Sequence, residues 1–305
     1  MRRRALTHDV HEARPIVKWA GGKAALVPAL LAELPPEIRT YVEPFAGGAA
    51  LFFALASSPA RRFRRARLND RNAELVACYR AVQSDLPALV ERLGTYRYDK
   101  ELYYQVRDVD PRDLGDVERG ARLLFLNRTC FNGLWRENSK GKFNVPFGTY
   151  KNPRILDPLL LERAHAALAG VKLSSDDFAD ACGRLGVGDF VYFDPPYVPA
   201  TKTASFTAYS ASGFTMADQQ RLVGLLGDLA KRGVKAMLSN ADTPETRALY
   251  QDFRVRAVSA RRPINSDPRK RGAAGELLVM NFDAEPARAP RARPPARPTA
   301  RGAGR

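Results

Sequence analysis

Cysteine and histidine are scarce in this 305-residue sequence, which contains three of each. Cys78, Cys130 and Cys182 lie far apart and show no paired ligand spacing, so we expect neither a disulfide framework nor a metal site. Long apolar runs are missing too. No run of 18 uncharged apolar residues occurs, and no apolar stretch follows the basic start at residues 1–4, so we expect neither a membrane span nor a secretory signal. The cysteines are interpreted as reduced core thiols of a cytoplasmic protein.

Acidic residues are outnumbered, with 33 Asp and Glu against 49 Lys and Arg, which gives a net charge of +16. Residues 284–305 consist mainly of Ala, Pro and Arg and contribute +5, so the preceding 283 residues still carry +11. A body this basic favours a polyanionic partner such as nucleic acid, although an arginine-rich composition without any ligand has the same charge. We predict that residues 1–13 and 284–305 are disordered, because neither segment can bury a core.

Strand-like and helix-like runs alternate over most of the remaining chain. Strand-like runs occur at 40–43, 67–70, 171–174, 189–194 and 234–239, of which 189–194 is nearly all apolar, and the patterns at 49–56 and 216–232 predict helices. Repeated strand–helix units predict an α/β fold with a mostly parallel sheet covered by helices. This rhythm breaks between about residues 74 and 158, where helical periodicity leads into a segment rich in Gly, Asn and Lys. That composition indicates an inserted subdomain.

Two motifs follow the first two predicted strands, at the edge where open parallel sheets bind ligands. Glu43–Gly48 combines small residues with a following helix, an arrangement that suits the amino-acid end of a cofactor, although a simple tight turn explains it equally well. Asp70 can accept hydrogen bonds from both hydroxyls of a ribose, but taken alone it is more simply a helix N-cap.

The strongest motif is Asp194-Pro195-Pro196-Tyr197, directly after the strand-like run 189–194. The two prolines fix the backbone, so the Pro195 carbonyl and the Asp194 carboxylate can together accept both hydrogens of an exocyclic amino group. Tyr197 can stack on a flat base. The alternative is a proline turn with a solvated Asp. The position after a strand favours instead a site that binds an amino-bearing aromatic substrate.

Two weaker motifs can contribute to the same site. Lys18–Lys23 lacks the spacing of a nucleoside triphosphate loop, but Trp19 and Lys23 can contact a cofactor, or can be a core Trp beside a surface Lys. Asp177 can accept from an adenine amino group and Phe178 can cover its ring, although acids in loops are usually only solvated.

Basic and aromatic residues at 131–136 and 140–150 predict a hairpin that contacts nucleic acid. Arg136 can read a guanine edge, and Leu134 and Pro146 can act as apolar wedges. An ordinary hairpin with a solvated basic face remains the alternative. The five arginines within residues 61–67 are expected to form a charged loop.

In this order, the motifs resemble those of the Dam-type, D12 class of DNA adenine N6-methyltransferases. The resemblance covers about Lys18 to Asn281. Its anchors are KWAGGK at 18–23, EPFAGG at 43–48, ND at 69–70, NGLWREN and KGKFNVPFGTYKNP across 132–153, DPPY at 194–197, FTAY at 206–209 and SN at 239–240.

The resemblance implies a Rossmann-like S-adenosylmethionine-dependent methyltransferase fold with an inserted, mainly helical target-recognition domain that carries a β-hairpin. The implied catalytic domain comprises 14–75 and 158–283, and the recognition domain 76–157. The residues implied to contact or line the S-adenosylmethionine site are Trp19, Lys23, Glu43, Phe45, Gly47, Asp70, Asp177, Phe178 and Asp194. The implied DNA contacts are Lys18, Asn132, Leu134, Arg136, Pro146 and Tyr150. Glu137 stands where relatives can carry an aromatic residue, and we expect this acid to face the DNA.

The resemblance further implies that adenine is flipped out of the duplex and methylated directly, with Asp194 and the Pro195 carbonyl accepting from N6. Phe206 and Tyr209 are expected in a loop that closes over the base. No metal and no histidine base are expected. Double-stranded DNA is the expected partner, GATC the expected site, and the protein is expected to be a monomer near the nucleoid, with any restriction endonuclease acting separately. The alternatives are N4-cytosine methylation, RNA adenine methylation and a non-catalytic DNA-binding module with a degenerate cofactor site.

Overall fold

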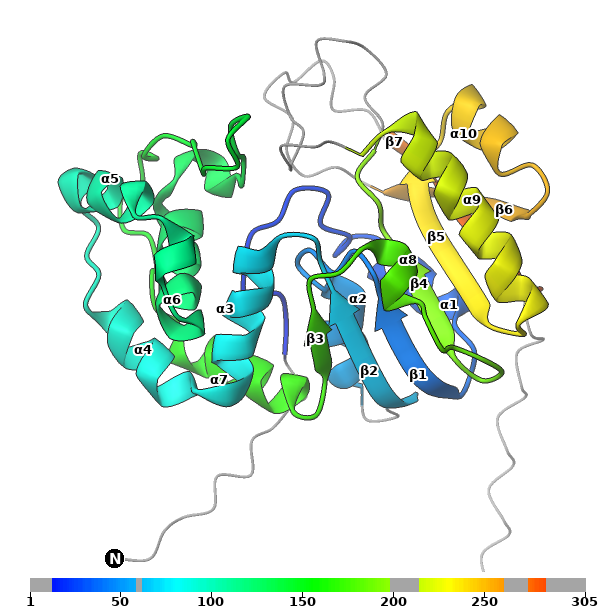
Figure 1. Cartoon of the computed structure of the whole chain (residues 1–305), viewed down its shortest axis with the longest axis horizontal. Coiled ribbons are helices and arrows are strands. Elements are labelled where there is room, and N and C mark those ends of the chain that lie inside the picture. Colours follow the sequence, from blue (N-terminus) through cyan, green and yellow to red (C-terminus); the bar gives the residue numbers. More distant parts are fainter. Residues whose placement is uncertain (1–12, 59–61, 198–213, 261–273, 284–305) are drawn as a thin grey trace, which may run out of the picture.

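The computed structural model describes residues 13–58, 62–197, 214–260 and 274–283, and in these residues a seven-stranded sheet forms the centre of the fold (Figure 1). The strands, in their order across the sheet, are β3 (Lys172–Ser174), β2 (Phe63–Asn69), β1 (Ile38–Glu43), β4 (Phe190–Phe193), β5 (Lys235–Ala241), β7 (Ala274–Met280) and β6 (Arg254–Ala260). β1 to β5 are parallel, and β7 runs antiparallel to both of its neighbours. The predicted α/β fold with a mostly parallel sheet is confirmed.

Both faces of the sheet are covered, because alternate side chains of the central strands belong to two separate apolar cores. In β4, Tyr192 packs in one core, and Val191 and Phe193 pack in the other. β1 divides in the same way between Tyr41 and Val42. This period of two is the geometry of a strand buried on both sides, and it explains why the run 189–194 is almost entirely apolar.

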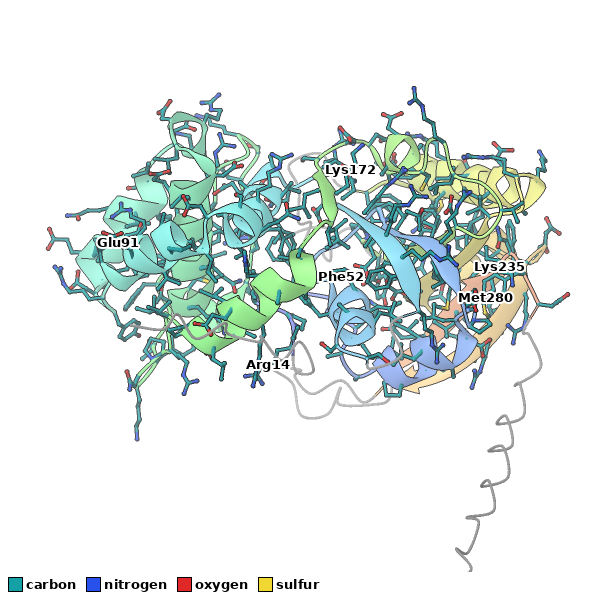
Figure 2. The ribbon with its side chains drawn as sticks, turned by 90° about the horizontal axis from the view of Figure 1, so that it is seen from below. Arg14, Phe52, Glu91, Lys172, Lys235 and Met280 are labelled. Carbon is teal, nitrogen blue, oxygen red and sulfur yellow. The ribbon has the colours of Figure 1, made fainter. Side chains whose placement is uncertain are left out.

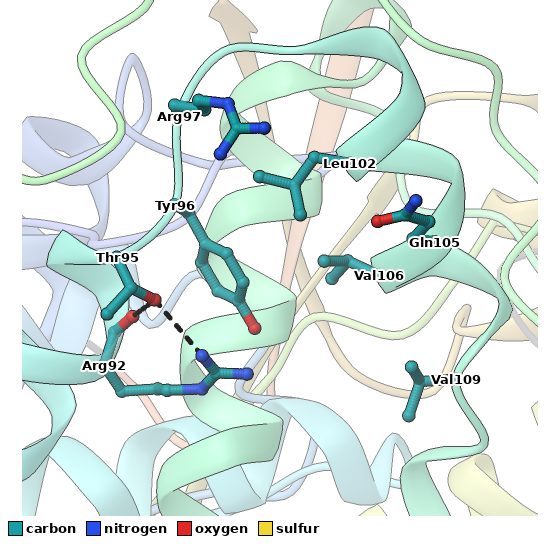
Figure 3. Close-up of a pocket in the computed structure, with 8 residues that line it drawn as sticks. All are labelled: Arg92, Thr95, Tyr96, Arg97, Leu102, Gln105, Val106 and Val109. Atoms are coloured by element: carbon teal, nitrogen blue, oxygen red, sulfur yellow. Dashed lines mark hydrogen bonds between the residues drawn. The ribbon is translucent and has the colours of Figure 1, made fainter.

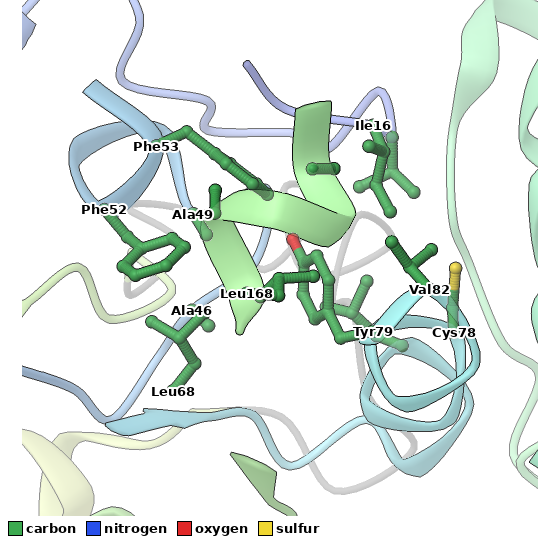
Figure 4. Packing of buried hydrophobic residues seen from close by; sticks show 14 of the residues in the cluster. Ile16, Ala46, Ala49, Phe52, Phe53, Leu68, Cys78, Tyr79, Val82 and Leu168 are labelled. Carbon is green, nitrogen blue, oxygen red and sulfur yellow. The ribbon is translucent and has the colours of Figure 1, made fainter. Parts of the chain in front are cut away.

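Helices supply the covering layers. Those described are α1 (Val27–Glu33), α2 (Ala50–Ala56), α3 (Ala73–Ser84), α4 (Leu86–Gly94), α5 (Lys100–Asp108), α6 (Asp116–Thr129), α7 (Pro158–Leu168), α8 (Phe178–Ala181), α9 (Met216–Lys231) and α10 (Pro244–Leu249). Figure 4 shows the larger core, where Phe52 and Phe53 of α2 lie near Tyr79 of α3. α9 buries Leu222, Leu226 and Leu229 in the second core.

Polar side chains begin several of these helices. The Asn72 side chain accepts from the Leu75 amide at the start of α3, and Thr215 and Asp218 form a reciprocal capping box at the start of α9. The capping box confirms the helix start that the sequence predicts there. Gly233 then follows α9 with a φ of 69°, a conformation that favours glycine.

The chain between β2 and β3 forms a helical body beside the sheet, made of α3 to α7 (Figure 1). α6 packs against α3, α4 and α5, and α7 packs on α3, α4 and α2. In Figure 2, Glu91 of this body lies at one end of the molecule, and Lys235 and Met280 of the sheet lie at the other. Because α3 and α7 contact both parts, the division into 76–157 and the flanking catalytic segments stays a prediction.

One local expectation is wrong. Residues 61–67 were expected to form a charged loop, but Phe63–Asn69 is strand β2. Its side chains Phe63, Ala66 and Leu68 are buried. Arg64 and Arg65 are exposed because β3 pairs only with the last three residues of β2, so the first half of β2 has a single neighbour.

The three cysteines are buried, as expected, and burial raises the pKa of the Cys78 thiol to about 12. In the described ranges, no helix is long and apolar enough to cross a membrane.

Candidate active site

Asp194 lies at the carboxyl end of β4, next to the equivalent end of β5. Its Oδ1 lies 2.8 Å from Nζ of Lys23 and accepts from Oγ of Ser239 at 2.9 Å. The register that pairs Phe193 with Leu238 brings Asp194 and Ser239 to the same level of the sheet. Burial raises the pKa of the Asp194 carboxyl, while Lys23 and Ser239 act in the opposite direction.

Lys23 is a buried ammonium group at the centre of this arrangement. Its side chain is 6% exposed, and Nζ also donates to the Gly21 carbonyl at 2.9 Å. Nζ lies 4.8 Å from the ring centroid of Tyr197 and 4.0 Å from Oε2 of Glu276. The Tyr197 hydroxyl donates to the same Glu276 oxygen at 2.6 Å. The Lys23 loop and the end of β4 are therefore brought together with β5 and β7.

Glu43 lies at the end of β1 and is 2% exposed. Its Oε1 accepts from the Phe52 amide at 2.9 Å and from the Tyr41 hydroxyl at 2.5 Å. Ala49, which precedes α2, provides no side-chain cap, so Glu43 satisfies an amide of the first turn of α2 from outside the helix. Burial raises the pKa of Glu43 to about 8, although both hydrogen bonds act to lower it.

Asp70, just after β2, anchors the glycine turn that follows β1. Its Oδ2 accepts from the Gly47 amide at 2.8 Å and its Oδ1 from the Asn72 amide at 2.9 Å. Asn72, and not Asp70, is the N-cap of α3. Gly47 has a φ of 46°, and a Cβ there would lie 2.9 Å from Cδ1 of Trp19, so glycine lets the Trp19 ring approach this turn.

Asp177 and Phe178 are tied into the fold near this edge. Oδ1 of Asp177 accepts from the Ala179 amide at 3.0 Å as the N-cap of α8, and from Arg221 at 2.7 Å. Phe178 is buried and stacks on half-buried Phe45 at 5.3 Å between ring centroids. The two rings form an aromatic wall beside the end of β1.

The expected DNA contacts Lys18 and Tyr150 lie together. Nζ of Lys18 lies 5.3 Å from the ring centroid of Tyr150. Asn127 of α6 binds both the amide and the carbonyl of Lys18, and also the Gly133 carbonyl. A Cβ at Gly133 would lie 2.4 Å from Cδ of Lys18, so this glycine allows the two segments to touch. The Lys18–Lys23 motif is thereby joined to the base of the hairpin.

The hairpin is present in an irregular form. Isolated bridges pair Cys130 with Phe147 and Glu137 with Phe143, without continuous strands. Arg136 is exposed, and its Nε donates to Oδ1 of Asn144 at 2.8 Å, which holds the guanidinium on the outer side of the hairpin. The other three expected DNA contacts are exposed as well: Asn132, Leu134 and Pro146.

Glu137 points to the other side of the hairpin from Arg136, the expected base-reading residue. Oε1 of Glu137 accepts from Nε1 of Trp135 at 3.0 Å and from Nδ2 of Asn72 at 3.2 Å, so the side chain turns toward the start of α3 and away from the exposed side that carries Arg136. Neighbouring residues of an extended segment point to opposite sides, which explains why Glu137 and Arg136 diverge. Trp135 in turn stacks on Trp19 at 5.9 Å.

A cavity of about 300 Å³ lies elsewhere, in the helical body around α4 and α5 (Figure 3). Arg92, Tyr96 and Val106 are among its lining residues, and none of the residues singled out in the sequence lines it. Within the part of the chain that the structure describes, no group of three His, Cys, Asp or Glu side chains could hold a metal ion.

Two residues at the candidate site had no role assigned from the sequence. Ser239 was noted only as part of the SN pair, and its position beside Asp194 follows from strand register. Glu276 was not singled out, although an acid placed directly before the apolar run Leu277–Met280 is a pattern in the sequence that could have indicated it. Phe206 and Tyr209 lie outside the described residues.

Comparison with known proteins identifies the family. The model of the D12 class N6 adenine-specific DNA methyltransferases matches residues 19–264. The chain is 41% identical to the type II methyltransferase M1.LlaDCHI of Lactococcus lactis subsp. cremoris, over 88% of this chain and 95% of that protein. It is 41% identical to M.MjaIII of Methanocaldococcus jannaschii, over 89% and 100%, and 34% identical to the DNA adenine methylase of Escherichia coli K12, over 88% and 95%. The chain belongs to the D12 class N6 adenine-specific DNA methyltransferases.

Proposed function

We propose that this enzyme transfers the methyl group of S-adenosylmethionine to N6 of an adenine flipped out of duplex DNA. The observation that carries the proposal is the Asp194 carboxylate at the end of β4, held through Oδ1 by Lys23 and Ser239 and followed by Pro195, Pro196 and Tyr197.

The residues near the ends of β1 and β2 suit the cofactor. Each Asp70 oxygen accepts one backbone N–H, and because a carboxylate oxygen can accept two hydrogen bonds, both can still bind ribose hydroxyls. Trp19 and Gly47 would flank the amino-acid end of the cofactor. Glu43 would hold the first turn of α2, which follows the glycine turn. Phe45 and Phe178 would cover the adenine ring of the cofactor, with Asp177 at its rim. When bound, S-adenosylmethionine supplies a methyl group on a sulfonium, a leaving group that accepts the electron pair of the broken C–S bond.

Asp194 and its neighbours would hold the target amine. Oδ1 is engaged with Lys23 and Ser239, so Oδ2 would accept one N6 hydrogen and the Pro195 carbonyl the other. These two bonds draw the N6 lone pair out of conjugation with the ring, and this pair forms the new N–C bond. Tyr197 would stack on the flipped base, and the surplus N6 proton leaves to water. Positioning and electrostatics then account for the catalysis.

Lys18, Tyr150 and the exposed side of the hairpin would contact the DNA, with Arg136 reading a guanine edge. The same groove of the DNA that Arg136 would read would also be contacted by Asn132, Leu134 and Pro146. We propose double-stranded DNA as the substrate and GATC as the first sequence to test. A monomer in the cytoplasm, close to the nucleoid, is the proposed working form, and any partner restriction endonuclease would act as a separate protein.

The test is methyl transfer from labelled S-adenosylmethionine to unmethylated genomic DNA, followed by nucleoside analysis and single-base mapping. N6-methyladenine at one short sequence is the expected product. N4-methylcytosine would reassign the target amine, and label incorporated only into RNA would reassign the substrate. Absence of cofactor binding in a calorimeter would indicate a non-catalytic DNA-binding module with a degenerate cofactor site, and cofactor binding without any label on DNA would indicate an RNA substrate or a lost activity.

A further inference from the structure

Glu276 is a buried acid that the methyl-transfer scheme above does not use. It lies in β7, where it pairs with Ala241 of β5 and Val258 of β6, and it is 6% exposed. The four residues that follow it, Leu277–Met280, are fully buried. A carboxylate in such a strand is costly unless it is paired, so its partners indicate what it does.

Both observed partners of Glu276 belong to the candidate active site. Oε2 accepts from the Tyr197 hydroxyl at 2.6 Å and lies 4.0 Å from Nζ of Lys23. Nζ of Lys23 lies 2.8 Å from Oδ1 of Asp194 and 4.8 Å from the centre of the Tyr197 ring. Glu276, Tyr197 and Lys23, from three separate parts of the chain, therefore form a closed ring of contacts, and Asp194 joins it through Lys23.

This ring of contacts restricts Tyr197 in two ways. The hydrogen bond to Glu276 fixes the far end of the phenol, and the Lys23 ammonium lies against one face of the ring. A flipped base can then stack only on the opposite face. Without Glu276, the phenol would lose this hydrogen bond, and Lys23 would keep its contacts with Asp194 and the Gly21 carbonyl.

We propose that Glu276 is a positioning residue that orients Tyr197 for base stacking and shares Lys23 with Asp194, so that N6 meets the Asp194 carboxylate at a fixed angle. This inference rests on the proposed function. It adds an acid from the antiparallel strand β7 to a site otherwise built on the parallel strands (Figure 1).

The experiment compares Glu276→Gln, Tyr197→Phe and the double variant with wild type, using a duplex that carries 2-aminopurine at the target position. We expect each single variant to lower kcat by roughly 10- to 100-fold, because small misplacements of reacting groups cost about this much. The KM for S-adenosylmethionine should change little. Emission from the flipped 2-aminopurine should rise, since stacking on an aromatic ring quenches it. The double variant should lose little beyond either single variant, because Glu276→Gln replaces the charged acceptor by a weaker amide oxygen and Tyr197→Phe removes the donor of the same hydrogen bond.

Glu33→Gln is the matched control. Glu33 is also a buried glutamate, but its partners are Arg254 and Arg256 on β6. Its substitution should lower thermal stability and leave kcat and 2-aminopurine emission unchanged. If Glu276→Gln does not fold, Tyr197→Phe still removes the hydrogen bond without altering β7, and its emission decides the question.

Wild-type kcat and emission in both Glu276→Gln and Tyr197→Phe would overturn the inference, as would additive losses in the double variant. Failure of the proposed function is a separate result, since it requires that wild type itself transfers no methyl group to adenine. An inactive Asp194→Ala enzyme beside a fully active Tyr197→Phe enzyme would keep the proposed function and remove Glu276 from the positioning role.

Discussion

At the scale of single residues, the candidate site depends on the pairing of a buried lysine with a partly exposed aspartate. The Lys23 side chain is 6% exposed and that of Asp194 is 22% exposed, and their charged atoms lie 2.8 Å apart. An unpaired buried charge is costly, so each group holds the other in place. The pairing also opposes the effect of burial on Asp194, whose ionised form is the better acceptor for an amine hydrogen.

Asp194→Ala is expected to lower methyl transfer by at least about 100-fold, the scale of loss found when one preorganised electrostatic contact is removed. The fold should persist, because Lys23 keeps its bond to the Gly21 carbonyl and its proximity to Glu276. Initial rates with labelled cofactor and a thermal melt of each protein measure both effects. An Asp194→Ala enzyme with wild-type rate would remove Asp194 from the reaction.

Glu43 should make stability depend on pH. Its folded-state pKa of about 8 lies above the ordinary value of 4.5, so the folded protein binds more protons than the unfolded chain between these values. Stability from this group is therefore fully present below pH 4.5 and is lost as pH rises from 4.5 to about 8, by at most about 1.4 kcal/mol per pH unit, with no further loss at higher pH. Glu43→Gln keeps an acceptor for Phe52 and Tyr41 and removes the titration. Urea unfolding at pH 5, 7 and 9 should show the variant gaining on wild type as pH rises, and a constant difference would contradict this.

At the scale of elements, the hairpin presents two sides with different partners. Arg136 and Leu134 are exposed, whereas Trp135 is buried against Trp19 and Glu137 contacts Asn72 at the start of α3. One side is thus available to DNA, and the other is attached to the loops proposed to bind the cofactor. The hairpin can hold a reading residue in a defined orientation although it has no continuous strands.

Arg136→Ala is expected to reduce discrimination at one base pair by roughly 1–3 kcal/mol, the value of a bidentate contact to guanine. Competition between duplexes that differ at single positions measures it. Lys140→Ala is the control, because an exposed lysine at the hairpin turn should affect affinity for all sequences alike. Unchanged selectivity in Arg136→Ala would assign the reading to another residue.

The sequence indicates only the end of strand β2, because its first residues include several arginines. Its arginines suggest a loop, but Phe63, Ala66 and Leu68 supply enough buried surface for a strand beside β1. The arginines are tolerated because three-residue β3 leaves half of β2 uncovered on one side. Local charge was therefore a poor guide where the neighbouring strand is short.

At the scale of the whole molecule, the charge of +16 should make DNA binding strongly dependent on salt, because phosphate contacts release counterions. Deleting residues 284–305 removes +5 of that charge. We expect weaker binding at low salt, a salt slope reduced by about 0.9 for each lost phosphate contact, and an unchanged methylated sequence. Affinity titrations from low to moderate salt, with mapping of the mark, test this. A changed target sequence would show that the tail takes part in recognition.

The sequence by itself determined the fold class and the main motifs, because strand periodicity, the glycine turn after β1 and the prolines after β4 are local patterns. The tertiary structure decided which side chains meet. Ser239 reaches Asp194 through the register of β4 and β5, and Glu276 reaches Tyr197 through the antiparallel pairing of β7. Glu137 turned out to contact Asn72, 65 residues away along the chain. Such contacts depend on register and on the packing of distant segments, and no local pattern of residues records them.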